Sequence, residues 1–314
     1  MMDFSVIVLI YNSDTEDLKL TIDSILQQKG ITYQIVLADD ASSNNALTEA
    51  EEYLREKGFK DYKICSHGEN VGTVRNVYDA LSVAEGKFVK LIGAGDALFS
   101  NFTLRNVYHF MDKKKLDMCF GKMKGYVRTE DGTEYSDIVL PYDIEAFEKN
   151  NIKKIRRNIL VNHGWIVGAG MFVDRTVFMD CLKEFVGKVR YCEDLVQTIF
   201  LLRKKSIGYF RGPVVYYENS GGISTSTNSG ARKRMYDDVR ALKKLLMDNY
   251  YDDPLVVKGN KMFAWQLIEN DRERQIKIFT GNTNYVRMLL RTKLQRKRYV
   301  IRKKGILENE STIR

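Results

Sequence analysis

The chain of 314 residues is 44% hydrophobic and 11% aromatic, which indicates a globular protein and excludes a disordered one. It contains no run of 18 apolar residues, so no membrane-spanning helix is predicted, and four scattered cysteines without C-x-x-C spacing argue against a zinc site or a disulfide framework. The net charge of +9 is concentrated in residues 274–307, which hold eleven Lys or Arg and no Asp or Glu. The first predicted strand follows residue 3 directly, so we expect no export signal and a reducing, cytoplasmic location.

The first three predicted elements form a β-α-β unit. Residues 4–12 and 34–44 are apolar runs that end in polar groups, and residues 14–28 between them carry apolar side chains at helical spacing. Such strands suit a parallel sheet that is covered on both faces, and these sheets bind ligands beyond the carboxyl ends of their strands. No glycine follows the first strand, which excludes a G-x-G-x-x-G dinucleotide loop. A pocket lined with carboxylates is expected instead, and it suits a sugar, a base and a metal ion.

The alternation of predicted strands and helices continues to about residue 230. Strands are predicted at residues 62–66, 87–92, 165–174 and 207–218, a hairpin at 118–140, and helices at 46–57, 71–84, 99–114, 144–158 and 193–204. Only helices are predicted from residue 231 onward. We therefore expect one domain at residues 1–230 and a helical, basic C-terminal extension at residues 231–314.

Six short motifs follow one another along the chain. They are F-S-V-I-V-L-I-Y-N at residues 4–12, Q-I-V-L-A-D-D-A-S-S-N at 34–44, N-V-G at 70–72, I-G-A-G-D-A-L at 92–98, Y-C-E-D-L at 191–195 and G-G-I-S-T at 221–225. Their order resembles that of the family 2 glycosyltransferases of the GT-A fold, of the kind that builds bacterial polysaccharides and other glycans. The resemblance covers roughly residues 1–226. It implies an α/β fold with a Rossmann-like, mainly parallel sheet flanked by helices, followed by the helical extension.

The resemblance also implies an activity, which is transfer of a sugar from a UDP-sugar or another nucleotide diphosphate sugar to a hydroxyl of a saccharide or lipid-linked acceptor. Tyr11 would border the base, and Asp39 or Asp40 would bind uracil or ribose. The full implied set is Tyr11, Asn12, Asp39, Asp40, Asn70, Gly72, Arg75 and Gly95 for the nucleotide, His163 and Gly170 for the acceptor, Gly222, Ser224 and Thr225 for a loop that closes over the donor, Asp194 with Glu193 for catalysis, and Asp96 for a metal ion.

The metal motif departs from the family pattern. The family usually has carboxylates at the positions of Gly93 and Gly95, and only Asp96 remains here. One carboxylate can still hold Mg²⁺ or Mn²⁺, because these ions are shared with diphosphate oxygens and waters. We therefore expect poor metal affinity without nucleotide. A mechanism in which cationic side chains neutralise the diphosphate stays open.

Asp194 is expected to act as the base that takes the proton of the attacking hydroxyl. It lies at the start of a predicted helix, where the helix dipole favours its ionised form. An ionised carboxylate opposite the leaving group implies direct displacement with inversion. The plainer alternatives are charges at a helix start for Glu193 and Asp194, a helix cap for Asp39 and Asp40, a tight turn for Gly93 and Gly95, a packed side chain for His163, and a solvated charge for Arg75.

The C-terminal segment from residue 282 to 304 has no glycine or proline and predicts a basic amphipathic helix. Val286, Leu290, Leu294 and Ile301 lie near one stripe, which suits an anionic membrane surface. The alternative is a helix packed on the catalytic domain or on a second copy of the chain. Three alternative functions are less favoured. A nucleic-acid-binding protein could use the basic tail, but the sequence has no DNA- or RNA-binding motif. A nucleotidyltransferase would have a glycine-rich loop after the first strand, which is absent, and the third alternative is a catalytically weak scaffold that binds a sugar nucleotide.

Overall fold

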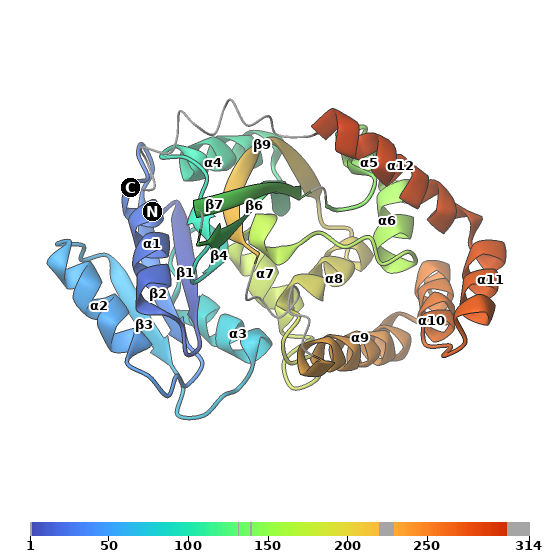
Figure 1. Ribbon diagram of the computed structural model, residues 1–314, viewed down its shortest axis with the longest axis horizontal. Helices are drawn as coiled ribbons and strands as arrows, with labels where there is room; N and C mark the ends of the chain where they lie inside the picture. Colours follow the sequence, from blue (N-terminus) through green and yellow to red (C-terminus); the bar gives the residue numbers. More distant parts are fainter. Residues whose placement is uncertain (1, 131, 139, 220–228, 300–314) are drawn as a thin grey trace.

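The computed structural model describes residues 2–130, 132–138, 140–219 and 229–299. Its centre is a mixed sheet, in which the described residues form nine strands (Figure 1). Four neighbouring strands are parallel, in the order β3 (Tyr62–Ser66), β2 (Tyr33–Asp39), β1 (Phe4–Ile10) and β4 (Phe88–Gly93). The other half continues through β8 (Met171–Asp174), β6 (Met118–Thr129), β9 (Ile207–Glu218) and β5 (Ala97–Leu98), with β7 (Gly132–Ile138) paired to β6.

Both faces of the parallel half are covered by helices because its strands are apolar on both sides. Val6 and Val8 of β1 belong to one core cluster, and Ile7 between them belongs to the other. The Val6 side is covered by α1 (Thr15–Leu26), α2 (Ala46–Glu56) and α4 (Thr103–Lys114). The Ile7 side is covered by α3 (Thr73–Val83), α5 (Ile144–Glu148), α6 (Ile152–Leu160), α7 (Arg175–Leu182), α8 (Gln197–Leu202) and α9 (Ser229–Tyr250).

Three predicted elements are divided or shortened in the structure. The helix expected at residues 144–158 is divided into α5 and α6, because Asn151 caps a new helix by accepting a hydrogen bond from the backbone N–H of Lys154 at 3.1 Å. The strand expected at 165–174 is extended only from Met171, after the 3₁₀ turn Gly168–Gly170. The helix expected at 193–204 begins as the 3₁₀ turn Glu193–Val196 and continues as α8.

The C-terminal segment is helical in all its described parts, as expected. Helices α9, α10 (Pro254–Gln266), α11 (Asp271–Gly281) and α12 (Thr283–Tyr299) lie on the side of the molecule away from α1 and α2 (Figure 1). Leu242 and Leu246 of α9 are buried in the same core cluster as Phe200 of α8. Among the described residues, none of the helices is long and apolar enough to cross a membrane.

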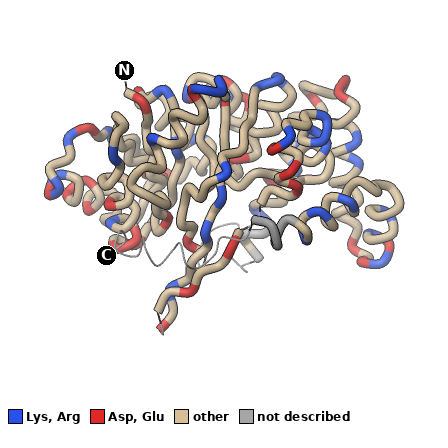
Figure 2. The backbone as a smooth tube through the Cα atoms, turned by 90° about the horizontal axis from the view of Figure 1, so that it is seen from above, with Lys and Arg blue, Asp and Glu red and all other residues tan. Residues whose placement is uncertain are grey.

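Helix α12 packs through only part of its surface. Met288 is 2% exposed and Thr292 is 5% exposed, whereas Leu290 and Leu294 are 57% and 69% exposed. The predicted stripe is therefore partly open to solvent, and its last member, Ile301, lies outside the described residues. Figure 2 shows that Lys and Arg are interspersed with Asp and Glu over most of the backbone.

Candidate functional site

The carboxyl ends of three parallel strands are aligned. Ile10 at the end of β1 lies opposite Asp39 at the end of β2, and Leu9 lies opposite Gly93 at the end of β4. The polar residues that follow these strands therefore meet at one edge of the sheet, where parallel α/β sheets bind their ligands. The sequence prediction placed the nucleotide at this edge.

The loops after β1 and β2 are joined by hydrogen bonds. Asn12, which has a left-handed backbone with φ of 49°, accepts at Oδ1 from the backbone N–H of Ser43 at 2.7 Å. Asp39 accepts from the backbone N–H of Ser42 at 3.1 Å and from the Ser42 hydroxyl at 2.5 Å. Tyr11 between these loops is 55% exposed, so its ring is open to a ligand. This fixed pair of loops presents the residues predicted for the nucleotide.

Asp40 has a different environment from Asp39. Its two carboxylate oxygens accept hydrogen bonds from the backbone N–H groups of Val71 at 2.7 Å and Gly72 at 3.0 Å. It is 6% exposed, and it thereby fixes the N-V-G loop against the end of β2. Asp39 therefore lies next to the loop of Tyr11, whereas both carboxylate oxygens of Asp40 are hydrogen-bonded to the backbone of residues 71 and 72.

The N-V-G loop also contacts the segment that precedes the catalytic pair. Arg190 donates from its guanidinium to the backbone carbonyl of Asn70 at 2.8 Å, and its own carbonyl accepts from the backbone N–H of Val74 at 3.0 Å. Gly72 has φ of 85°, and a Cβ at this position would lie 2.4 Å from Cγ of Arg190. Glycine is therefore required here for close packing as well as for its backbone conformation. The predicted donor loop is therefore in direct contact with Arg190, three residues before the predicted acid pair.

Arg75 follows this loop on the first turn of α3. Its guanidinium lies 2.6 Å from the carboxylate of Asp79, one helical turn further along, and about half of its side chain is exposed. This pairing raises the pKa of Arg75, first through the hydrogen bond to Asp79 and then through the charge of that carboxylate. Arg75 is thus occupied by a neighbour on its own helix, and its contact with a phosphate stays a prediction.

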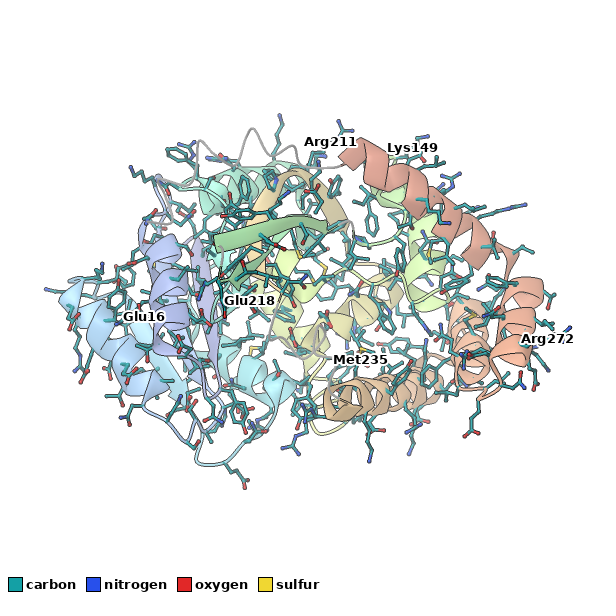
Figure 3. All side chains as sticks on the ribbon, viewed as in Figure 1. Glu16, Lys149, Arg211, Glu218, Met235 and Arg272 are labelled. Carbon is teal, nitrogen blue, oxygen red and sulfur yellow. The ribbon has the colours of Figure 1, made fainter. Side chains whose placement is uncertain are left out.

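Asp96 lies beside Glu218, the last residue of β9. The backbone N–H of Glu218 donates to Oδ1 of Asp96 at 2.9 Å, and Asp96 is 7% exposed (Glu218 is labelled in Figure 3). Burial raises the pKa of Asp96 to about 7, against the effect of this hydrogen bond and of the Lys90 charge, while the Glu218 charge raises it further. Gly95, with φ of 90°, places its carbonyl as an acceptor for the hydroxyl of Tyr126.

Lys90 is a buried cation in the strand that leads to Asp96. It is fully buried, its ammonium donates to the carbonyl of Ala169, and it lies 5.0 Å from the ring centre of Phe172. Burial lowers the pKa of Lys90 to about 8, with the charge of Asp96 opposing the effect. The only signal for it in the sequence is one lysine in the apolar run F-V-K-L-I-G.

The donor set around Asp96 fits a divalent ion only together with a ligand. The described residues contain no group of three or more His, Cys, Asp or Glu that could hold a metal. Asp96 and Glu218 are hard oxygen donors next to each other, which suits Mg²⁺ or Mn²⁺, but these ions need about six oxygens. Diphosphate oxygens and waters would have to supply the others.

The predicted catalytic pair lies beside the 3₁₀ turn that precedes β8. Asp194 accepts a hydrogen bond at Oδ2 from the backbone N–H of Gly168 at 3.2 Å, and both acids are partly exposed. A Cβ on Gly168 would lie 3.1 Å from Cβ of Asp194 and 3.2 Å from Oε1 of Glu193. The two acids line a small pocket with Val89, Leu91, Gly168, Met171, Val173 and Phe178. This pocket lies along β4, whose end leads to Asp96.

The two carboxyl groups differ in acidity. Burial raises the pKa of Glu193 to about 8, and the charges of Asp194 and Asp238 raise it as well. Burial raises the pKa of Asp194 only to about 6, because backbone N–H groups of Gly168, Asp194 and Leu195 oppose it. Burial opposes the ionised form that is expected for Asp194, but a pKa of about 6 still leaves this carboxyl group mainly ionised near pH 7. Near pH 7 the pair therefore holds one proton, mainly on Glu193.

Asp238 of α9 positions this pair from the C-terminal part of the chain. Its carboxylate accepts hydrogen bonds from the backbone N–H groups of Arg190 at 3.0 Å, Tyr191 at 2.7 Å and Cys192 at 2.9 Å. It is 5% exposed. Three successive amides thus converge on one buried carboxylate, which fixes the segment directly before Glu193.

The predicted acceptor residues lie further from this pair than Gly168 does. The rings of His163 and Trp165 are stacked, with their centres 4.9 Å apart, and Nδ1 of His163 lies 2.9 Å from Oε1 of Gln266 on α10. Burial lowers its pKa well below the usual value, and the charge of Lys243 adds to the effect. Gly170 is buried, and a Cβ there would lie 3.1 Å from the carbonyl of Gly121 on β6. The residues predicted for the closing loop, Gly222, Ser224 and Thr225, lie outside the described residues.

Comparison with known families decides the class of the chain. The model of glycosyl transferase family 2 matches residues 5–182, more than half of the chain. The chain belongs to glycosyl transferase family 2. The family and the fold class expected from the sequence are thereby confirmed.

Two curated relatives are similar over part of the chain. TarS of Staphylococcus aureus, a poly(ribitol-phosphate) β-N-acetylglucosaminyltransferase, is 33% identical over 127 residues, which are 40% of this chain and 22% of TarS. An uncharacterised glycosyltransferase of Methanocaldococcus jannaschii is 24% identical over 152 residues, or 48% of this chain and 49% of the relative. The matched segments therefore span about a fifth of TarS and about half of the archaeal protein.

Solved structures of S. aureus TarS share the fold. Residues 1–349 of TarS in complex with UDP-GlcNAc match with a TM-score of 0.59 and 18% identity, over 91% of this chain and 81% of that one. The complex with UDP matches with a TM-score of 0.57 over 88% and 75%. At this identity the likeness concerns the fold.

Proposed function

We propose that this family 2 chain is an inverting glycosyltransferase that moves a sugar from a UDP-sugar to a hydroxyl of a saccharide or lipid-linked saccharide acceptor. The observation that carries the proposal is the pair Glu193 and Asp194, partly exposed beside Gly168 and joined through Arg190 to the N-V-G loop. Glycosyl transfer requires a base that is held near the donor, and Arg190 joins the segment of the acid pair to the predicted donor loop. The complexes of TarS with UDP and UDP-GlcNAc support a uridine donor.

In the proposed reaction Asp194 accepts the proton of the acceptor hydroxyl as that oxygen attacks the anomeric carbon. The new bond forms while the bond between the anomeric carbon and the diphosphate breaks, so the configuration inverts and UDP leaves with the electron pair. Asp194 is the better base at neutral pH because its pKa is the lower of the pair. Glu193 in its protonated form limits the repulsion between the two acids and can donate a hydrogen bond to the acceptor.

The donor would be held by residues at the ends of β1, β2 and β4. Tyr11 offers an exposed ring for the base, and Asn12 and Asp39 offer oxygens that are already fixed by Ser43 and Ser42. Asp96, with Glu218 beside it, would hold Mn²⁺ or Mg²⁺ on the diphosphate. A divalent ion bound there supplies charge neutralisation for the leaving group. The buried ammonium of Lys90 adds a positive charge beneath the same site.

Attachment to the cytoplasmic face of a membrane is proposed for the C-terminal helix. Leu290 and Leu294 of α12 are exposed on the same helix as Arg287 and Arg291, which is the arrangement of an interfacial helix. This location would suit a lipid-linked acceptor. Cosedimentation of the protein with anionic vesicles, and its loss in a Leu290→Ser/Leu294→Ser variant that keeps its melting temperature, tests this part.

The function is tested by a binding panel followed by a turnover assay. Thermal shift with UDP, GDP and dTDP, each with and without Mn²⁺, should give the largest stabilisation with UDP and Mn²⁺. UDP release from UDP-sugars in the presence of saccharide acceptors should then be measured for the parent and for Asp194→Asn. Donor binding without turnover for any acceptor would favour the sugar-nucleotide-binding scaffold. Absence of nucleotide binding, with salt-sensitive binding of random DNA, would favour the nucleic-acid alternative.

A further inference from the structure

A basic cavity lies between α6 and α12, apart from the donor site. Its volume is about 380 Å³, which is within the size range of small-molecule sites, about 300–1,000 Å³. Five cationic side chains line it together with a single carboxylate: Lys153, Lys154, Arg157, Arg287, Arg291 and Asp143. None of the residues that line the cavity belongs to the predicted catalytic pair or to the predicted donor site.

The positions of these cations on their helices are electrostatically unfavourable. Lys153 and Arg157 are four residues apart on α6, and Arg287 and Arg291 are four residues apart on α12, so each helix carries a like-charge pair. Lys153 and Lys154 lie in the first turn of α6, which contains no acid, although the helix dipole favours anions there. An anion between the two helices would relieve all of these repulsions.

Three of the five cations are available to such an anion. Lys154 pairs with Asp143 at 2.6 Å, and Arg291 pairs with Glu145 at 3.0 Å. Lys153, Arg157 and Arg287 have no ion pair or hydrogen bond from their side chains in the part of the chain that the structure describes, and all three are exposed. Lysine and arginine side chains converging from two helices are the usual receptor for a phosphate group.

Asp143 adds a requirement that a bare phosphate does not meet. It is 1% exposed, and its Oδ1 has no hydrogen-bond partner among the described residues, with the guanidinium of Arg291 3.7 Å away. A buried carboxylate oxygen of this kind needs a hydrogen-bond donor. A hydroxyl group supplies one, whereas the phosphate group of a monoester dianion has no O–H to donate.

We infer that this cavity binds a phosphorylated polyol, with the phosphate on Lys153, Arg157 and Arg287 and a hydroxyl on Oδ1 of Asp143. A soluble sugar or glycerol phosphate, or a polymer of such units, has this chemistry, and so does the headgroup of a glycerol-containing phospholipid. The inference does not depend on the activity proposed above, because none of these residues belongs to the donor site or the catalytic pair.

The test is calorimetric titration of the full chain with glycerol 3-phosphate, methyl phosphate and glycerol, at a pH where both monoesters are dianions. Glycerol 3-phosphate should bind about 3-fold or more tighter than methyl phosphate, because only it has a hydroxyl group for Asp143, and glycerol alone should not bind. The double variant Arg157→Gln/Arg287→Gln should lower the affinity about 10-fold or more. The matched control Lys277→Gln/Lys293→Gln removes two exposed cations outside the cavity and should change the affinity less than about 2-fold.

Two further measurements tell a lipid headgroup from a soluble ligand and test the role of Asp143. UDP binding of every variant serves as the control for correct folding. Vesicles of phosphatidylglycerol that bind the parent and not the double variant, without binding of soluble glycerol 3-phosphate, would assign the group to a lipid headgroup. Asp143→Asn should reduce the preference for glycerol 3-phosphate over methyl phosphate. The inference fails if the control pair weakens binding as much as the cavity pair, or if glycerol 3-phosphate is displaced by UDP, which would place it in the donor site. UDP binding should be equal in all variants.

Discussion

The carboxylate of Asp238 accepts a hydrogen bond from the backbone N–H of Tyr191 at 2.7 Å and so joins α9 to the segment that leads to the proposed catalytic pair, Glu193 and Asp194. The same carboxylate holds the amides of Arg190 and Cys192. Arg190 in turn holds the N-V-G loop. One buried side chain therefore supports both the donor loop and the acid pair, although it lies more than forty residues beyond them in the sequence.

Asp238→Asn should lower both stability and activity. An amide can accept fewer of the three backbone hydrogen bonds and brings a donor next to the amides of residues 190–192, so we expect a loss of about 1–3 kcal/mol in the free energy of unfolding. The exposed neighbour Asp237, which pairs with Arg240 at 3.0 Å, provides the control, and Asp237→Asn should be nearly neutral. Urea unfolding of both variants measures this. Equal stability of the two would show that the buried carboxylate does not support the turn.

Asp194→Asn should abolish most of the turnover while the protein still binds the donor. The amide keeps the shape of the side chain and cannot take a proton, so kcat should fall about 10²–10⁴-fold with little change in UDP affinity. The rate of the parent should rise with pH through a transition near pH 6, where the pair loses its first proton. A larger loss in Glu193→Gln than in Asp194→Asn would reverse the roles of the two acids.

The pH dependence of stability should change in Glu193→Gln. Burial raises the pKa of Glu193 from 4.5 to about 8, so between these values the folded state holds a proton that the unfolded state has lost. The stability of the parent should therefore fall as pH rises from about 5 to 8. Glutamine has no such proton, so the melting temperature of the variant should rise relative to that of the parent over the same range. A constant difference from pH 5 to 8 would contradict the raised pKa.

Asp96→Ala should remove most of the response to metal. The thermal shift with UDP and Mn²⁺ should approach that with UDP alone, because the buried oxygen donor next to the predicted diphosphate position is lost. Glu218→Gln should have a smaller effect in the same direction, since its carboxylate lies beside Asp96. If both variants keep the full Mn²⁺ response, the ion is bound elsewhere.

Gly168→Ala should impair catalysis without disturbing the donor. Its Cβ would lie 3.1–3.2 Å from atoms of Asp194 and Glu193, so these side chains must shift by a few tenths of an ångström, and we expect roughly a 10-fold loss of kcat. Gly93→Ala serves as the control, because a Cβ there meets no atom within 4 Å. UDP affinity should be unchanged in both. Full activity of Gly168→Ala would indicate that the acids adjust freely.

The parallel half of the sheet and the meeting of its polar strand ends could be predicted because their signals are local. Apolar strands that end in polar residues specify where the strands stop, and parallel pairing then aligns Tyr11, Asp39 and Asp96 at one edge. The supporting contacts could not be predicted in this way, since they join distant segments. Lys90 contacts the carbonyl of Ala169, and Asp96 contacts the backbone of Glu218.

The pKa values of Glu193 and Asp194 also could not be predicted from the neighbouring sequence. The position of Asp194 at a helix start indicated an ionised group, and a pKa of about 6 leaves it mainly ionised near pH 7. The value itself depends on burial, which raises this pKa, and on the backbone N–H group of Gly168, which lowers it, and neither can be read from the local sequence. Burial of α9 in the core of the catalytic part is a further long-range effect, because its helical pattern alone does not specify which surface it covers.

The hydrogen bonds of Asp238 limit where this protein can be joined to a relative in a chimaera. A chimaera that joins residues 1–218 to the C-terminal helices of another family member would keep the strand ends and both acids. It would lose the acceptor for the amides of Arg190, Tyr191 and Cys192 unless the incoming helix carried a carboxylate at the position of Asp238. Exchange of acceptor specificity between relatives should therefore be attempted with α9 retained and the exchange made after Tyr250, where that helix ends.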